Sequence, residues 1–205
     1  QTQDAYLTWG WEGREDYPGR MVAVPSPLYS PYADRHRERN PALIMVAGEE
    51  RLHAHRLETG HQSGQAVTSR RHRRTFLTAL TPGIRDHLRY RPYPGGHGVL
   101  PDEPYMRRQV PDLQILDGPV EPQLMHCRLV VIDHPTTTFA LAMAANVPTI
   151  AFLRPDVWHY ARQAEPHFER FRELGIVFDG PEDAAAKVAD VWDDVEAWWA
   201  QPDIQ

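Results

Sequence analysis

The segment from Cys127 to Leu153 constrains the fold of this chain more than any other. It reads CRLVVIDHPTTTFALAMAANVPTIAFL. Two apolar runs, Arg128–Ile132 and Pro148–Leu153, flank a helix-like stretch at Thr137–Asn146. Short, continuous apolar runs are typical of strands that are buried on both faces, as in parallel sheets. The segment therefore predicts one β-α-β unit with a polar turn after its first strand.

The same alternation continues on both sides of this unit. The further elements that we expect are a strand at Pro41–Gly48, a helix at Ala66–Leu80 with Ser69 as a candidate N-cap, a strand at His87–Tyr93, a helix at Val157–Leu174, a strand at Ile176–Phe178 and a last helix from Pro181. Strands that alternate with helices predict an α/β fold, here a Rossmann-like doubly wound parallel sheet.

The first forty residues have a different character, being rich in aromatic residues and proline. Only Arg20–Val24 resembles a strand. We therefore expect an irregular lead-in at residues 1–40 and a Rossmann-like domain at residues 41–205. Because the chain begins with Gln1 rather than Met, and ends just after a strong helix pattern, we also expect it to be a fragment that lacks an N-terminal domain.

Composition excludes several classes of protein. The chain has 28 acidic and 22 basic residues and a formal charge of −6, whereas general nucleic-acid binders carry basic faces. Its single cysteine, Cys127, cannot form an intrachain disulfide and is expected to be a small core residue. No apolar run approaches the roughly 18 residues of a membrane span, and no signal peptide is evident. We expect a cytoplasmic protein.

The polar turn from Asp133 to Thr138 is the first candidate binding site. Backbone N–H groups at the start of a helix attract anions, and the helix dipole adds to this attraction. The hydroxyls of Thr136, Thr137 and Thr138 supply further donors. The alternative is that one threonine only caps the helix, but three exceed what a cap needs. Such a turn suits a phosphate, a carboxylate or a sugar. It is not a Walker loop, because it lacks the glycines and the lysine of that motif.

Two other turns are weaker candidates. Arg89 and Arg91, followed by His97 in a glycine-rich turn, could grip a diphosphate in bidentate fashion, and a solvated basic loop is an equal alternative. Arg154 follows the strand that ends at Leu153. It could close over a ligand or belong to a simple turn.

A cluster of histidines and an arginine-rich run are the remaining candidates, and neither is expected to form a binding site. His53, His55 and His61 have no cysteine or carboxylate at a familiar ligand spacing, so we expect no metal site. The run Arg70–Arg74 is expected to be a solvated helix face, with contact to anionic lipid or an anionic acceptor as the alternative.

Several motifs can then be taken together. They are Asp133-His134-x-Thr-Thr-Thr-Phe, Ala144-x-Asn146-x-Pro148-Thr149-Ile150-x-Phe152, Trp158, Gly175-Ile176 and Trp198-Trp199, with Trp9-Gly10-Trp11 and the Arg89–Gly98 region. This pattern resembles the LIC12162-type family of bacterial transferases, which is linked to O-antigen and other surface-carbohydrate gene clusters. The resemblance covers most of the chain. Turns related to residues 133–152 also occur in GT-B glycosyltransferases and in glycerophosphotransferases of the teichoic-acid type.

The resemblance implies a GT-B-like enzyme with two Rossmann-like halves, of which this chain would be mainly the C-terminal, donor-binding half. Asp133, His134 and Thr136–Thr138 would bind the donor's phosphate or sugar. Arg89 and Arg91 would neutralise the leaving diphosphate, and Arg154 would contact substrate. The catalytic base would be His97 or His134, unless it lies in the expected N-terminal domain. Such enzymes generally need no bound metal, and no cofactor is expected.

The function implied is a glycosyltransferase-like transferase of surface polysaccharide or O-antigen synthesis. It would use a nucleotide-activated sugar and a saccharide or lipid-linked acceptor, in the cytoplasm or in peripheral contact with the inner membrane. One departure matters, since Leu141 stands where related turns often carry a glutamate that contacts the donor. Two alternatives remain: a glycerophosphotransferase using a CDP-glycerol-type donor, and a degenerate, non-catalytic binding domain.

Overall fold

The structure is a computed structural model that describes residues 4–10, 12, 19–50, 63–95 and 98–204. Its centre is a five-stranded parallel sheet in the order β4-β3-β5-β6-β7. The strands are β3 (Leu43–Val46), β4 (Leu88–Arg91), β5 (Leu129–Ile132), β6 (Thr149–Phe152) and β7 (Val177–Phe178). The predicted α/β fold with a Rossmann-like parallel sheet is therefore confirmed.

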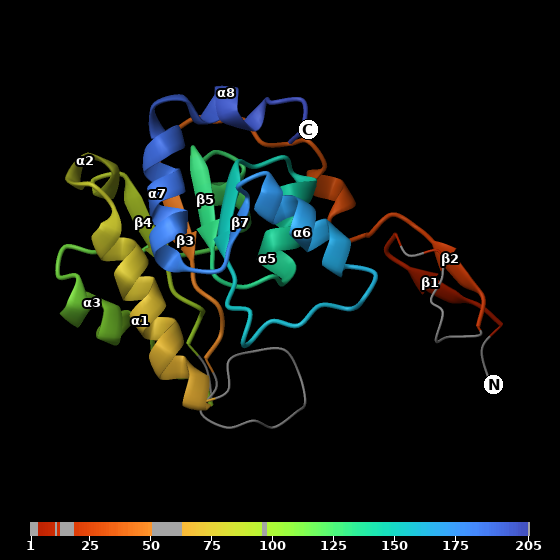
Figure 1. Ribbon diagram of the computed structural model, residues 1–205, viewed down its shortest axis with the longest axis horizontal. Coiled ribbons are helices and arrows are strands. Elements are labelled where there is room, and N and C mark those ends of the chain that lie inside the picture. The colour runs from red at the N-terminus through yellow and green to blue at the C-terminus, as the bar shows by residue number, and fades with distance from the viewer. Residues whose placement is uncertain (1–3, 11, 13–18, 51–62, 96–97, 205) are drawn as a thin grey trace.

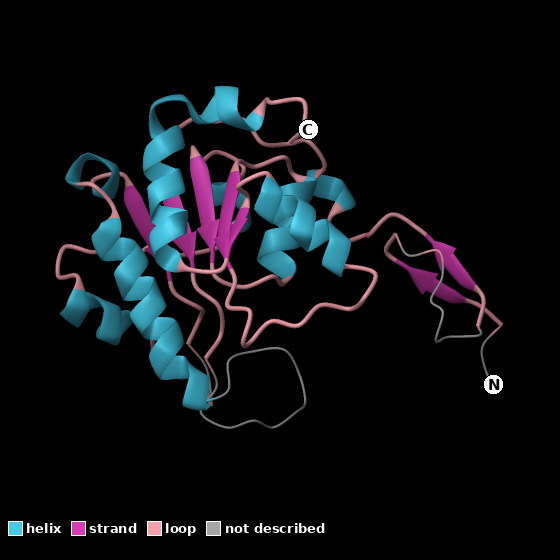
Figure 2. Cartoon of the chain, in the orientation of Figure 1, coloured by secondary structure: helices cyan, strands magenta, loops and turns pink. Residues whose placement is uncertain are grey.

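Helices flank this sheet on both sides (Figures 1 and 2). They are α1 (Ser63–Ala79), α2 (Pro82–Arg85), α3 (Glu103–Gln109), α4 (Glu121–Leu124), α5 (Thr137–Ala144), α6 (Glu165–Glu173), α7 (Pro181–Val191) and α8 (Val195–Trp199), with short 3-10 helices η1 (Ser30–Tyr32) and η2 (Trp192–Asp194). Helices α1 and α7 pack against each other across one face. No helix in the described ranges is long and apolar enough to cross a membrane.

The core explains why the short apolar runs become strands. Every residue of β3, β5 and β6 is buried, because helices cover both faces of the sheet. The apolar side chains that fill these strands have no polar atoms to satisfy, so they can occupy an interior from which water is excluded. Cys127, at the start of this region, is fully buried, and burial raises the pKa of its thiol to about 12.

The chain connections create a crevice at one edge of the sheet. From β3 the chain passes outward to β4, whereas from β5 it passes in the opposite direction to β6. The carboxyl ends of β3 and β5 therefore lie at the point where the strand order reverses, which is where ligands bind in open α/β sheets. The register places Val46 opposite both Arg91 and Ile132, so the residues that follow these three meet at this edge.

Two local predictions were wrong. The helix expected from Val157 begins only at Glu165, because Pro166 is accommodated in the first helical turn, whereas a proline in a helix interior removes a backbone hydrogen bond. Ser69 is not an N-cap. It lies inside α1, and its hydroxyl donates to the Gln65 carbonyl at 3.1 Å.

The lead-in contains elements that the sequence did not suggest as a pair. Strands β1 (Tyr6–Thr8) and β2 (Met21–Ala23) form a separate two-stranded parallel sheet, which stands away from the main sheet (Figure 1). The chain then returns to the body of the molecule. The backbone N–H groups of Asp34 and His36 donate to carbonyls at the end of α5, at 3.1 and 3.0 Å. Residues 34–40 thus run along the amino edge of the main sheet.

Candidate functional site

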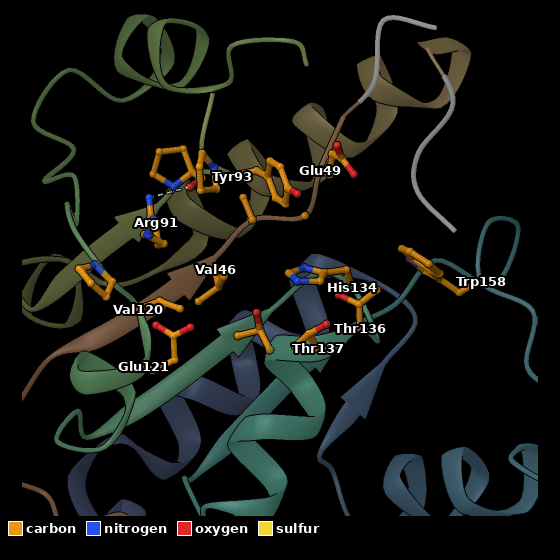
Figure 3. Close-up of a pocket in the computed structure, with 16 residues that line it drawn as sticks. Val46, Glu49, Arg91, Tyr93, Val120, Glu121, His134, Thr136, Thr137 and Trp158 are labelled. Carbon is orange, nitrogen blue, oxygen red and sulfur yellow. Dashed lines mark hydrogen bonds between the residues drawn. The ribbon is translucent and has the colours of Figure 1, made fainter. Parts of the chain in front are cut away.

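A cavity of about 550 Å³ lies at the carboxyl edge of the sheet (Figure 3). The turns after β3 and β4, the start of α4, the turn after β5 and Trp158 contribute its walls. The residues that line it include Gly48, Arg91, Glu121, His134, Thr136, Thr137, Thr138 and Trp158. The cavity therefore coincides with the crevice at which the strand order reverses.

His134 and Asp133 form a hydrogen-bonded pair at one wall of the cavity. His134 lines the cavity, while Asp133 lies beneath it and is 5% exposed. The Nδ1 atom of His134 is 3.0 Å from Oδ1 of Asp133, and the same oxygen accepts the backbone N–H of Gly48 at 2.6 Å. An ionised carboxylate can only accept, so this contact requires a proton on Nδ1 and leaves Nε2 as an acceptor in the neutral ring.

Gly48 makes this arrangement sterically possible. A Cβ added at Gly48 would come within 3.1 Å of Cγ and 3.2 Å of Nδ1 of His134. Such distances are tighter than ordinary van der Waals contact, so a side chain here would press the imidazole away from its place. The glycine that ends the β3 run thus serves the close approach of the turn and the histidine ring.

The three threonines occupy the start of α5. Thr136 is the N-cap residue by its backbone, yet its side chain makes no capping hydrogen bond. In the described part of the chain, the hydroxyls of Thr136, Thr137 and Thr138 make no hydrogen bond, and all three residues line the cavity. The capping alternative therefore leaves these hydroxyls unexplained. The first N–H groups of an eight-residue helix open at the same place.

A buried ionic network lies directly behind the His134–Asp133 pair. Arg73 of α1 is 0% exposed, and its Nε donates to Oδ2 of Asp133 at 2.5 Å. Its Nη1 atom donates to Oε1 of Glu50 at 2.9 Å, and its Nη2 donates to the Gly48 carbonyl at 3.1 Å. Nη1 also lies 3.4 Å from Oδ2 of Asp102. One guanidinium thus holds the residues that follow β3 and β5.

Further side chains extend this network toward β4 and the protein surface. The Tyr90 hydroxyl, on β4, donates to Oδ2 of Asp102. The half-buried Arg70 donates from Nε to Oε2 of Glu50 at 2.6 Å, and the same atom is 3.4 Å from Oδ1 of Asp102. Two cations therefore face three carboxylates in a region nearly closed to water.

This environment shifts the protonation of the groups within it. Burial raises the pKa of Glu50 to about 7, and the attraction of Arg73 and Arg70 only partly offsets that effect. For Arg73, burial acts to lower the pKa, but Asp133, Tyr90, Asp102 and Glu50 outweigh it and hold the pKa above its usual value. Burial likewise raises the pKa of Tyr90. Arg73 is thus a permanent cation, and the carboxyl group of Glu50 titrates near pH 7.

Two further sides of the cavity carry a carboxylate and an aromatic ring. Glu121, at the start of α4, lines the cavity and is half-buried, and among the described residues its side chain makes no hydrogen bond or ion pair. Trp158 lines the cavity from the segment after β6 and is 9% exposed. Figure 3 shows both side chains around the same space as His134 and Thr137.

The structure brings some of the predicted site residues together and separates others. His134, Thr136, Thr137, Thr138 and Arg91 line one cavity, and Asp133 lies behind it. His97 falls outside the described residues, as do His53, His55 and His61. Within the described ranges, no group of three or more histidine, cysteine or acidic side chains could hold a metal ion.

Two predicted arginines lie away from the cavity. Arg89 pairs with Ile44 near the amino end of β4 and lines a separate hollow of about 210 Å³. Arg154 is buried, donates to Asp156 at 2.5 Å, and contacts the Gln65 carbonyl and Ser69 at 3.3 Å. It ties the end of β6 to the first turns of α1.

No sequence pattern singled out Arg73, Glu50, Asp102, Tyr90 or Glu121 as a site residue. Arg73 was expected on a solvated face, and that expectation was wrong. A signal existed in the helical spacing, because the buried positions of α1 and of the residue that follows it are Ala66, Ser69, Arg73, Phe76, Leu77 and Leu80. Arg73 lies on this stripe at the three- and four-residue steps of one helix face. The charges of its neighbours drew attention away from that position.

Leu141, the position where a glutamate was expected, is buried in α5 among core residues and does not line the cavity.

A comparison with models of protein families gives a match over residues 1–205, the whole length of the chain, to the model described as LIC12162 family transferase. A search of curated proteins found no match. The chain therefore belongs to the LIC12162 family, whose description is that of a transferase.

Proposed function

We propose that this protein is a glycosyltransferase-like transferase of surface polysaccharide synthesis, including O-antigen, and that it uses a nucleotide-activated sugar. The observation that carries the proposal is the meeting of the α5 helix start, three threonine hydroxyls and Arg91 at one cavity. Nucleotide-activated donors are recognised by their diphosphate. Helix N-termini and arginine are the groups that bind phosphate most readily.

In this proposal the diphosphate lies against the start of α5. The N–H groups and hydroxyls of Thr137 and Thr138 donate to phosphate oxygens, and the guanidinium of Arg91 adds a full positive charge. Transfer of the sugar leaves negative charge on the departing nucleoside diphosphate. Donors fixed in advance around that charge stabilise the transition state without having to reorganise.

Glu121 and Trp158 give the cavity a second recognition chemistry. A carboxylate accepts hydrogen bonds from neighbouring hydroxyls of a ribose or sugar ring, and an indole ring stacks on a base or sugar face. Glu121 can therefore perform the role of the acid that is absent at Leu141, from a different element. This combination favours a polyhydroxylated ligand over a simple phosphate.

His134 is the proposed general base. The acceptor's hydroxyl oxygen forms a bond to the anomeric carbon of the donor as the bond from that carbon to the phosphate oxygen breaks. The nucleoside diphosphate departs with the electron pair, and the acceptor's proton passes to Nε2 of His134. Asp133 keeps the ring in the required tautomer and stabilises its protonated form, as carboxylates do in other histidine-containing sites.

We further propose that the chain is the donor half of a GT-B-like enzyme and that an N-terminal half carries the acceptor, a saccharide or a lipid-linked sugar. The small β1–β2 sheet supports this idea. Isolated two-stranded sheets are marginal, and parallel strands are usually covered on both faces. Yet Leu7 of β1 is 66% exposed, and the neighbouring Trp9 is 54% exposed. A covering domain would bury these side chains.

Arg91→Ala tests the donor site. Loss of one charged contact to phosphate should weaken binding of the donor about tenfold to a hundredfold and reduce turnover accordingly. The matched control is Arg89→Ala, which removes the same type of side chain from a position of β4 that lies away from the cavity. Isothermal titration with the donor measures both. Equal affinities for Arg91→Ala and the wild-type protein would contradict the proposed site.

A screen of donors separates the sugar transferase from its alternatives. The melting temperatures of the wild-type protein and of the Arg91→Ala variant are each measured with UDP-glucose, GDP-mannose and CDP-glycerol. A shift with a nucleotide sugar, lost in the variant, supports the proposal. A shift with CDP-glycerol alone makes the protein a glycerophosphotransferase instead. If none of these nucleotides raises the melting temperature, the non-catalytic alternative stands.

A further inference from the structure

Arg73 is the one fully buried cation in the described part of the chain, and its contacts are directed at the candidate site. It comes from the middle of α1, on the face that packs over the sheet. Its three guanidinium nitrogens reach Asp133, Glu50 and the Gly48 carbonyl at 2.5, 2.9 and 3.1 Å. One rigid, planar group therefore fixes the turns after two different strands.

Stability alone is a poor explanation for such a residue. Removing charged groups from water is costly, and well-packed apolar residues of similar volume often give equal or greater stability. Ionic groups in an interior are then explained better by the geometry that they impose. In this structure the imposed geometry is that of the Asp133 carboxylate, because Arg73 occupies one of its oxygens and leaves the other for Gly48 and His134.

The two oxygens of Asp133 have different partners, and this division defines the orientation of His134. Oδ2 accepts from Nε of Arg73, and Oδ1 accepts from the Gly48 N–H and faces Nδ1 of His134. Without Arg73, the carboxylate would be free to rotate toward other donors. The Nδ1 atom of His134 would then lose its fixed acceptor, and the ring could adopt the other tautomer.

We propose that Arg73 is a positioning residue that orients Asp133 and thereby keeps His134 in the tautomer with its proton on Nδ1. The inference rests on the proposed role of His134 as a base, but the tautomer itself is a property of the protein without substrate. Arg73 reaches the cavity lining at the Gly48 carbonyl, and it acts on His134 through Asp133. Lysine cannot replace it fully, since an ammonium group lacks the planar fork that contacts all three partners.

The test is the ring nitrogen spectrum of His134 in protein labelled with ¹⁵N-histidine, recorded without ligand at a pH where the ring is neutral. The wild-type protein should show a protonated Nδ1 and an unprotonated Nε2. Arg73→Lys should lower the ratio of the Nδ1–H to the Nε2–H tautomer about tenfold, the effect of losing one charge-assisted hydrogen bond. An unchanged ratio in a folded Arg73→Lys protein overturns the proposal.

Two controls separate positioning from general damage. Arg74→Lys alters the adjacent, exposed arginine of α1 and should leave the tautomer ratio unchanged. Glu50→Gln weakens the network on the side away from Asp133 and should also preserve the ratio. If Glu50→Gln shifts the ratio as much as Arg73→Lys, the network acts as a whole and the specific role of Arg73 is refuted.

A measurement on the wild-type protein covers the case in which Arg73→Lys does not fold. If Arg73 and His134 are linked through one carboxylate, Nε–H of Arg73 and Nδ1–H of His134 should exchange with solvent through the same opening of the structure. Equal free energies of opening support the proposal, and free exchange at His134 beside a protected Arg73 overturns it. Neither result depends on donor binding, so this test can fail while the donor screen succeeds, and the reverse.

Discussion

The two edges of the main sheet each carry a cavity, and they differ in chemistry rather than in size. The carboxyl-edge cavity measures about 550 Å³ and the amino-edge cavity about 670 Å³. At the amino edge, backbone groups of residues 34–40 bond to the ends of helices α4 and α5, and Trp199 Nε1 donates to Asn146 at 2.6 Å. There the backbone N–H groups and the indole donor are already paired, and the exposed side chains of Glu38 and Glu196 also line the cavity. At the carboxyl edge, helix N–H groups, threonine hydroxyls and Glu121 face open space.

Volume alone therefore does not distinguish the two cavities, whereas the pairing of their donors does. Donors that are already paired offer a ligand little, because each new contact would replace an existing one. A cavity lined by unused donors, with a fixed ionic network behind it, offers contacts that cost no internal bond. The comparison predicts that changes at the carboxyl edge alter ligand binding, whereas changes at the amino edge alter only stability.

The largest effect is expected for Arg73→Met. This change leaves three carboxylates in a buried region with only Arg70 to compensate them, so it should lower the free energy of unfolding by about 3–5 kcal/mol. Arg74→Met, on the exposed side of the same helix, should stay within about 0.5 kcal/mol of the wild-type value. Urea unfolding of both variants provides the measurement. Similar losses in the two variants would contradict the buried network.

A smaller, pH-dependent effect is expected at Glu50. Its pKa in the fold is about 7, above the ordinary 4.5, so the fold holds this proton more tightly than the unfolded chain does. The resulting stabilisation is fully present below pH 4.5 and is lost as the pH rises through 7. Relative to Glu50→Gln, the wild-type protein should lose about 2 kcal/mol of unfolding free energy between roughly pH 5 and pH 8.

Urea unfolding of wild-type protein and Glu50→Gln at several pH values tests this directly. The difference between the two curves is the informative quantity, since it cancels the titration of all other groups. Parallel curves would mean that Arg70 and Arg73 keep Glu50 ionised throughout this range. The carboxyl edge would then carry a fixed charge rather than a titrating one.

The smallest effect is expected at the amino edge, for Asn146→Gly. Asn146 has φ +59, a conformation that glycine adopts without strain, so the change removes mainly the hydrogen bond to Trp199. The cost should be about 1 kcal/mol. If a nucleotide that shifts the melting temperature of the wild-type protein shifts this variant equally, the edges are functionally distinct. A lost nucleotide shift in Asn146→Gly would remove the distinction.

Much of the fold could be predicted from the sequence because its signals are local. The apolar runs around β3, β5 and β6 indicated buried parallel strands, and helix patterns lay between them. The polar turn at residues 133–138 could also be predicted, since hydroxyls and charges after a buried strand have no role in packing. By contrast, the helix expected from Val157 was wrong over its first turns, where the aromatic spacing suggested a helix but the chain forms turns before Pro166.

The distinctions that matter for function depended on contacts between distant segments. Arg89 and Arg91 look alike in sequence, yet only the strand register brings Arg91 to the cavity. Arg73 looked like a surface charge among other arginines, and only the tertiary structure brings it against Asp133, 60 positions away. The sequence by itself determined the layers of this protein. The tertiary structure decided which charges are buried together, because electrostatic pairing depends on distance in space and not along the chain.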